Sequence, residues 1–105
     1  MLIIDDIREL CTDENIIISR HAIDKMKERD INRKEIFQSI FNGEIIEQYP
    51  TDYPYPSCLI SGISVNEKQI HIVAGLGENK LWIITVYYPG QEKWENGYKI
   101  RKVGK

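Results

Sequence analysis

The chain has 105 residues, of which 42% are hydrophobic and 29% charged, and its formal net charge is −2. This length suits one domain with one modest core, and the composition is too apolar for a disordered chain. No apolar run approaches the roughly 20 residues of a membrane span, and the first residues lack the basic and apolar segments of a signal peptide. We therefore expect a cytoplasmic protein with no membrane contact.

The charged residues are unevenly distributed along the chain. Residues 1–14 hold five acidic side chains and one arginine, whereas residues 93–105 hold five basic side chains and one glutamate. We expect one domain over residues 1–105, in which an acidic N-terminal helix within 1–14 precedes a mildly basic core over 16–102. Such a core suits a nucleic-acid partner, but an ordinary solvated surface has the same composition.

Apolar residues recur at helical spacing in the first part of the chain. This pattern predicts a helix over Leu2–Cys11, and the β-branched run Ile16–Ile18 is typical of an extended segment. Ser19 is a good N-cap for a helix over residues 20–29. The expected core face of that helix consists of Ala22, Ile23 and Met26.

A further helix is expected after Asn32, which is also a favoured N-cap residue. Its apolar stripe consists of Ile36, Phe37, Ile40 and Phe41. Asn42 and Gly43 follow, and we expect glycine to end the helix in the left-handed conformation that it tolerates.

From Glu44 onward the apolar pattern alternates, which predicts β-strands. Four are expected, over residues 44–49, 57–65, 69–76 and 80–88. Both faces of the last one are apolar, which is typical of a central strand. One face would hold Leu81, Ile83, Thr85 and Tyr87, and the other Trp82, Ile84, Val86 and Tyr88. The predicted fold class is α+β, with N-terminal helices packed on a four-stranded antiparallel sheet.

His21, Lys25 and Arg29 are spaced four residues apart, so they lie along one face of the 20–29 helix. An imidazole, an ammonium and a guanidinium in line suit a phosphodiester, because arginine grips a phosphate with a planar fork and lysine offers a point charge. The alternative is a solvated helix face with ordinary charge pairs.

His71 is the single ionisable residue in an apolar strand, on the same face as Gln69, Val73 and Gly75. An imidazole has an ordinary pKa near 6.5 and can act as a general base near neutral pH. A histidine in this setting is more often a structural residue.

The segment that follows the last strand combines aromatic and basic residues. Tyr87, Trp94 and Arg101 could stack on a base and neutralise a phosphate; alternatively Trp94 closes the core and Arg101 is a surface charge. The aromatic side chains of the 49–55 loop either line a groove or pack over the sheet edge. Cys11 and Cys58 have no metal-ligand or catalytic spacing, and two isolated histidines predict neither a metal site nor a cofactor.

These residues resemble a small uncharacterised bacterial family, catalogued as a domain of unknown function and commonly placed near RelE-like and BrnT-like toxins. The resemblance covers about residues 16–102. Its most specific part is the pair His21 and Ala22, followed by a basic residue, Met26, Glu28 and Arg29. The later matches are Ile31, Ile45, Ile46, Tyr49, Pro50, Ile70, His71, Thr85, Val86, Tyr87 and Trp94. Family members often have arginine at the position of Lys25 and glycine at that of Asp30.

The resemblance implies a RelE-like fold, of the type shared by barnase, EndoU and colicin nucleases. It also implies a toxin of a type II toxin–antitoxin pair that cleaves RNA, including ribosome-associated mRNA, by 2′-hydroxyl attack and without a metal. The partner would be an antitoxin, in some members of a zinc-finger and helix-turn-helix build. The catalytic residues would be His21, His71, Arg29 and Tyr87, with Lys25, Arg101 and Trp94 binding the substrate.

Two other interpretations remain open. One is a non-catalytic binding module or degenerate toxin on the same scaffold, and the other is a protein whose histidines are structural. The nuclease interpretation requires His21, Arg29, His71 and Arg101 to converge on one partly exposed, positive groove.

Overall fold

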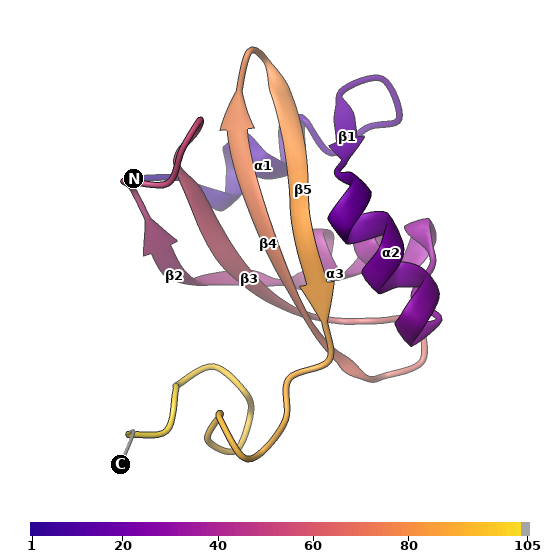
Figure 1. Ribbon diagram of the computed structural model, residues 1–105, viewed down its shortest axis with the longest axis vertical. Helices are drawn as coiled ribbons and strands as arrows, with labels where there is room; N and C mark the ends of the chain where they lie inside the picture. Colours follow the sequence, from indigo (N-terminus) through magenta and orange to yellow (C-terminus); the bar gives the residue numbers. More distant parts are fainter. Residues whose placement is uncertain (104–105) are drawn as a thin grey trace.

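The computed structural model describes residues 1–103 and contains three helices and five strands. The elements follow one another in the order α1 (Ile4–Glu9), β1 (Ile16–Ile18), α2 (Arg20–Arg29), α3 (Arg33–Asn42), β2 (Glu44–Tyr49), β3 (Ser57–Ile63), β4 (Gln69–Gly77) and β5 (Lys80–Tyr87). The α+β class expected from the sequence is therefore confirmed (Figure 1).

The sheet has five strands rather than the expected four, in the order β1-β5-β4-β3-β2. Strands β2 to β5 form an antiparallel meander, whereas β1 pairs parallel with β5. The expectation of a purely antiparallel sheet was wrong because the short run Ile16–Ile18 lies along the free edge of β5, opposite Leu81–Ile83. Those backbone bonds give β5 a neighbour on each side.

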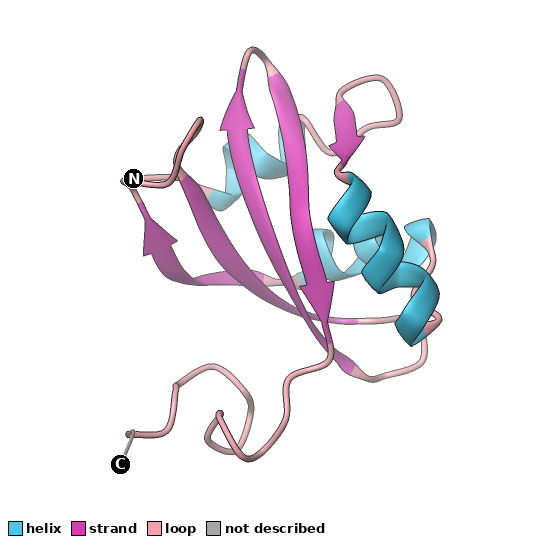
Figure 2. Ribbon diagram, viewed as in Figure 1, coloured by secondary structure: helices cyan, strands magenta, loops and turns pink. Residues whose placement is uncertain are grey.

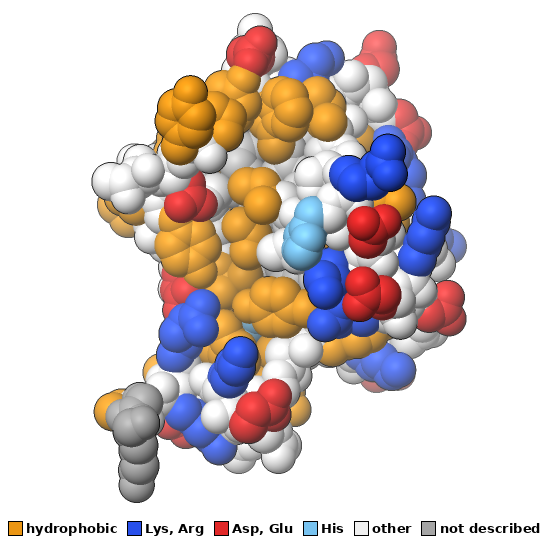
Figure 3. All heavy atoms as spheres, in the orientation of Figure 1, with side chains coloured by type: hydrophobic (Ala, Val, Ile, Leu, Met, Phe, Trp, Pro, Cys, Tyr) orange, Lys and Arg blue, Asp and Glu red, His pale blue; other side chains and the backbone are white. Residues whose placement is uncertain are grey.

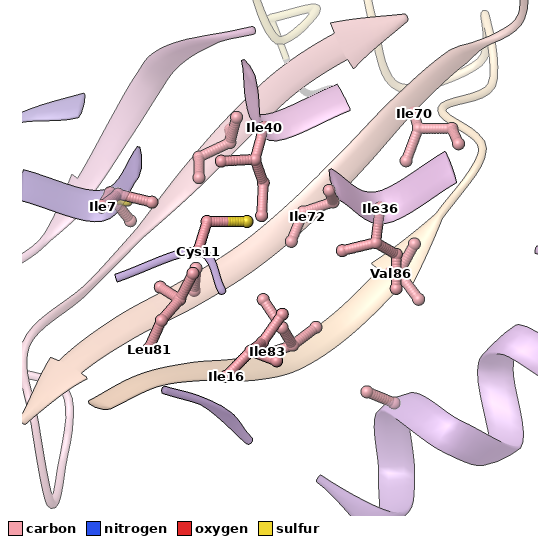
Figure 4. Close-up of a cluster of buried hydrophobic side chains, with 14 of the residues drawn as sticks. Ile7, Cys11, Ile16, Ile36, Ile40, Ile70, Ile72, Leu81, Ile83 and Val86 are labelled. Atoms are coloured by element: carbon pink, nitrogen blue, oxygen red, sulfur yellow. The ribbon is translucent and has the colours of Figure 1, made fainter. Parts of the chain in front are cut away.

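Helices α1 and α3 lie behind one face of the sheet, and α2 lies beside β5 beyond the end of β1 (Figure 2). The core fills the space between the sheet and the helices (Figure 4). Its buried residues include Ile7, Ile36, Ile40, Ile70, Ile72, Leu81, Ile83 and Val86. The opposite face of the sheet, which we call the open face, carries no helix within residues 1–103.

The helix boundaries follow from local side-chain chemistry. The Ser19 hydroxyl accepts a hydrogen bond from the backbone N–H of Ala22, and Asn32 and Glu35 form a reciprocal capping box at the start of α3. Asp30 ends α2 with a φ of 56°, in the left-handed region. Aspartate tolerates this conformation better than most residues other than glycine, so it can end the helix here.

Gly43 does not end α3 in the left-handed conformation that we expected, because its φ is −91°. A Cβ atom at this position would overlap the backbone of Ser39 and approach that of Ser61. Glycine is therefore needed here for the close approach of α3 to β3.

The N-terminal helix is shorter than expected, spanning Ile4–Glu9, and it packs on the domain. Ile7 is fully buried, and the guanidinium of Arg8 donates to the carbonyl oxygens of Ile40 and Gly43 at 3.4 and 2.8 Å. These bonds satisfy carbonyl groups at the end of α3 that have no partner within the helix.

No helix within residues 1–103 is long and apolar enough to cross a membrane.

A β-bulge in β5 changes which of its residues face the core. Val73 pairs with Thr85 and Ala74 with Ile83, so Ile84 is an extra residue on its strand. The alternation shifts by one position after the bulge. Val86 is therefore buried in the core and Tyr87 lies on the open face, the reverse of what the uninterrupted pattern predicted.

Candidate functional site

A cavity of about 410 Å³ lies on the open face, between α2, the end of β5 and the C-terminal segment, which we define as residues 90–103. We call this cavity the cleft. Its lining includes five of the residues singled out from the sequence: Lys25, Arg29, Tyr87, Trp94 and Arg101. Thr85, Tyr88, Glu92 and Lys93 also line it. Figure 3 shows Lys and Arg side chains grouped over α2 and over the C-terminal segment on this side of the molecule.

Helix α2 contributes the basic side of the cleft. Its N-cap fixes the helix against β5, since the Ser19 hydroxyl also donates to the carbonyl oxygen of Ile84 at 3.0 Å. One turn apart, Lys25 and Arg29 both face the cleft, and Glu28 lies 3.5 and 3.9 Å from their charged groups. The Nη1 atom of Arg29 is buried and, within residues 1–103, has no hydrogen-bond partner.

His21 stands beside the cleft rather than in it. Its exposed imidazole Nε2 lies 3.1 Å from the hydroxyl oxygen of Thr85, which does line the cleft. Because Thr85 can donate or accept, either tautomer of His21 satisfies this bond. The spacing of four residues therefore brings His21, Lys25 and Arg29 to one side of the molecule, with the histidine next to the cavity.

His71 lies beneath the cleft and is fully buried, with 0% of its surface exposed. Its Nε2 atom is 2.6 Å from the carbonyl oxygen of Tyr98, which can only accept, so this nitrogen carries the hydrogen. In the neutral ring Nδ1 is then the acceptor, and it receives the hydroxyl of Tyr87 at 3.2 Å. The Tyr87 ring meets His71 edge-on, as does that of Trp94, with centroids 5.3 and 4.5 Å away.

Burial sets the protonation states of His71 and Tyr87. It lowers the pKa of His71, against the opposing effects of the Tyr98 carbonyl and the Glu47 carboxylate. Burial also raises the pKa of Tyr87. At neutral pH both side chains are therefore uncharged, and the Tyr87 hydroxyl lies between the cleft and an imidazole that accepts its hydrogen bond.

The C-terminal segment is held across the open face by side chains of β2. Arg101 donates to the Glu47 carboxylate from Nε at 2.7 Å and from Nη2 at 3.2 Å, and its guanidinium stacks over Trp94 at 4.6 Å. The Tyr49 hydroxyl also donates to Glu47. Although burial acts to raise the pKa of Glu47, the bonds from Arg101 and Tyr49 lower it overall. Burial and the Glu47 contact raise the pKa of Tyr49 to about 12.

The cleft is only mildly positive. Four cations line it: Lys25, Arg29, Lys93 and Arg101. Three carboxylates offset their charge. Glu92 lines the cavity, Glu28 lies beside Lys25 and Arg29, and Glu47 pairs with Arg101. Four cations and three acids leave one net positive charge. This balance suits the binding of a single phosphate group better than a long polyanion.

The structure thus brings Lys25, Arg29, Tyr87, Trp94 and Arg101 together, sets His21 at their edge and seals His71 below them. The sequence analysis gave no role in the site to Glu47, Thr85 or Lys93, and it left open whether Tyr49 and the other aromatic residues of the 49–55 loop line a groove. Glu47 and Tyr49 belong to the site because the side chain of Glu47 on β2 bonds Arg101 of the C-terminal segment. The sequence contains no local signal for this contact. Thr85 does stand out as a polar residue within an apolar strand.

The two cysteines are buried and lie outside the cleft. Burial raises the pKa of the Cys11 thiol to about 11 and that of Cys58 to about 12, so both stay protonated and unreactive. In the part of the chain that the structure describes, no three or more His, Cys, Asp or Glu side chains are grouped to hold a metal ion.

Comparison with known proteins adds a family. The profile of a domain of unknown function, DUF4258, matches residues 18–88. No curated protein and no solved structure matches the chain. The matched residues run from β1 to the end of β5, and include His21, Lys25, Arg29, His71 and Tyr87 but not Trp94 or Arg101. The match covers more than half of the sequence, so the chain belongs to the DUF4258 domain family.

Proposed function

We propose that the protein is an endoribonuclease toxin of a type II toxin–antitoxin pair, which binds RNA at the cleft and cleaves it without a metal. The observation that carries this proposal is the meeting of Lys25, Arg29 and Arg101 with Tyr87 around one cavity, next to the exposed His21. Cations beside hydroxyl and imidazole groups are what cleavage of a phosphodiester by its own 2′-hydroxyl requires.

The cations would hold the phosphate. Arg29 lines the cleft and its side chain is 34% exposed, so the accessible part of its guanidinium would donate to a phosphate oxygen. Lys25 lies one turn away on the same side of α2 and adds a point charge. Together they would neutralise the charge that develops on the phosphate as the 2′-oxygen attacks.

Proton transfer would fall to His21 and Tyr87, because His71 is too deeply buried to touch a substrate. His21, in its neutral form, would take the proton of the 2′-hydroxyl, because its imidazole is exposed beside the cleft. Tyr87, which lines the cleft, would give its hydroxyl proton to the leaving 5′-oxygen. The products are a 2′,3′-cyclic phosphate and a 5′-hydroxyl, and solvent restores both side chains to their starting protonation states.

A RelE-like ancestry and an antitoxin partner complete this proposal. Four antiparallel strands with helices on one face are consistent with the RelE-like arrangement, to which this chain adds the parallel strand β1. The antitoxin would be a protein of zinc-finger or helix-turn-helix build, and the RNA would include mRNA on the ribosome.

A second candidate is a non-catalytic module that binds RNA or protein through the same cleft. The burial of His71 favours it, since both ring nitrogens are already hydrogen-bonded and the ring is inaccessible. The pairing of Arg101 with Glu47 also favours it, because one cation of the cleft is partly neutralised.

Induced expression separates the two candidates. A nuclease toxin arrests growth and leaves new RNA ends with 5′-hydroxyl groups, and the purified protein cleaves RNA in the presence of a chelator. We expect His21→Ala and Tyr87→Phe each to slow cleavage by about 10²-fold or more, the usual contribution of a general acid or base. Arg29→Ala should weaken both binding and cleavage.

Lys27→Ala is the matched control for Arg29→Ala, because Lys27 is a cation on the same helix but outside the cleft. It should leave growth arrest unchanged. A folded wild-type chain that neither arrests growth nor produces new RNA ends would refute the nuclease proposal. Retained RNA binding in that case would support the non-catalytic module.

A further inference from the structure

A second hollow lies on the open face, at the other end of β5. It has a volume of about 460 Å³, and we call it the aromatic hollow. Its lining consists of Asp52, Tyr53, Pro54, Tyr55, Gly75, Trp82 and Ile84. The indole N–H of Trp82 donates to the Gly77 carbonyl at 3.0 Å, which fixes the ring on the sheet.

Two glycines of β4 create this hollow. A Cβ atom at Gly77 would overlap the ring of Tyr55, so glycine allows that ring to lie directly on the strand. Gly75 pairs with Trp82 in the sheet register and lines the hollow without a side chain. Tyr55 and Trp82 then stand with centroids 5.5 Å apart and planes tilted by 33°. The aromatic surface therefore depends on residues of β4 and β5, and not on the loop alone.

The hollow is open to solvent. Tyr53 at its rim is 95% exposed, and Ile84 is exposed as well. Its single charged lining residue, Asp52, accepts a hydrogen bond from the Ser57 hydroxyl. Tyr53 is exposed and the rings of Tyr55 and Trp82 are half-buried, so the hollow presents an aromatic surface to solvent, as binding surfaces do.

The hollow and the cleft adjoin on one strand. Ile84 lines the hollow and the next residue, Thr85, lines the cleft. Figure 3 shows hydrophobic side chains over the middle of this face, bordered by Lys and Arg side chains over α2 and over the C-terminal segment. Aromatic rings next to a cationic groove are the combination that binds single-stranded nucleic acid, because the cations hold the backbone while the bases stack.

We infer that the aromatic hollow is a base-stacking subsite, which selects unpaired RNA over duplex RNA by taking a base next to the phosphate held in the cleft. This inference rests on the proposed function, since it assigns the class of RNA that the cleft receives. A duplex cannot use the subsite, because its bases are already stacked within the helix.

Binding of a labelled 2′-O-methyl RNA tests the inference, since this probe has no attacking hydroxyl and is not cleaved. The full chain is titrated with a 12-nucleotide single strand and with the same strand annealed to its complement, over a range of salt concentrations. Trp82→Ala and Tyr53→Ala should each weaken single-strand binding by roughly 5- to 150-fold, the usual effect of losing one stacked base. The slope of affinity against salt should not change.

Three variants make the result specific. Trp82→Phe keeps an aromatic ring and should recover most of the affinity. Phe41→Ala removes an aromatic side chain that is 52% exposed on α3, in the other layer of the molecule, and should have no effect. Lys25→Ala should instead flatten the salt dependence by about 0.7 in logarithmic slope, because it removes a phosphate contact.

The possible outcomes distinguish failure of the proposed function from failure of the subsite alone. A wild-type chain that binds neither probe refutes both the proposed function and the subsite. Binding that is lost in Lys25→Ala but unchanged in Trp82→Ala and Tyr53→Ala refutes the subsite alone. Equal affinity for the single strand and the duplex also refutes it. Tyr53 is almost fully exposed, so its variant remains informative even if Trp82→Ala does not fold.

Discussion

The imidazole Nε2 of His71 lies 2.6 Å from the carbonyl oxygen of Tyr98, 27 residues further along the chain. This bond ties the middle of β4 to the C-terminal segment, which lies beyond the residues matched by the family profile. The family domain therefore supplies the histidine, and the C-terminal segment buries it. The same segment adds Trp94 and Arg101 to the cleft.

Stability should depend on pH through His71. Burial lowers its pKa in the folded state, so the unfolded chain binds more protons once the pH falls below the ordinary value of about 6.5. The free energy of unfolding should therefore decrease as the pH is lowered from 7.5 to 5.5, and level off below the folded-state pKa. Urea unfolding at a series of pH values measures this.

His71→Gln should remove most of that decrease, whereas His21→Gln should leave it in place. The comparison is made above pH 5, because the lowered pKa of Glu47 adds its own loss of stability in more acidic solution. If His71→Gln retains the full wild-type decrease, the buried imidazole is not its source.

Glu47→Gln should loosen the C-terminal segment with little change in global stability. The substitution keeps the size of the side chain but removes the charge that pairs with Arg101. Because Arg101 is half exposed, we expect a loss below about 1 kcal/mol in the free energy of unfolding. Hydrogen exchange should be faster at the backbone N–H groups that hold this segment together, those of Glu95 and Lys102.

The control for this change is Glu44→Gln, which breaks the neighbouring and more exposed pair with Lys99. It should alter exchange less. Unchanged protection of Glu95 and Lys102 in Glu47→Gln would mean that Trp94 and the Tyr98 carbonyl hold the segment without the ion pair.

Gly62→Ala should destabilise the fold by about 1–3 kcal/mol, the usual cost of overpacking. A Cβ atom at Gly62 would overlap the backbone of Ser39, so α3 would have to move away from β3. Thermal unfolding measures the loss. Ile63→Ala, at the exposed next position, should cost clearly less, and equal losses would argue against a close approach of α3 to β3.

Ser19→Ala should weaken both the fold and RNA binding. The hydroxyl caps α2 and also donates to the Ile84 carbonyl, so its removal should cost about 1–2 kcal/mol and release the helix that carries Lys25 and Arg29. Asn32→Ala removes the cap of α3, away from the cleft, and should cost about 1 kcal/mol without reducing affinity. Equal affinities for the two variants would show that the anchoring of α2 does not position the cleft.

Local chemistry was enough to predict most of the secondary structure. The caps at Ser19 and Asn32 and the alternation from Glu44 onward depend on neighbours within a few residues. The spacing of Lys25 and Arg29 likewise predicted that both would reach one surface, because helical geometry is the same in any fold.

Tertiary structure decided what surrounds those residues. Strand β1 became part of the sheet because β5 offered a free edge, and the bulge at Ile84 exchanged the faces of Val86 and Tyr87. His71 stood out from the sequence as a lone ionisable residue, but whether it was catalytic or buried depended on Trp94 and Tyr98, more than 20 residues away. Burial and protonation are set by contacts between distant segments, and a pattern of neighbouring residues does not contain them.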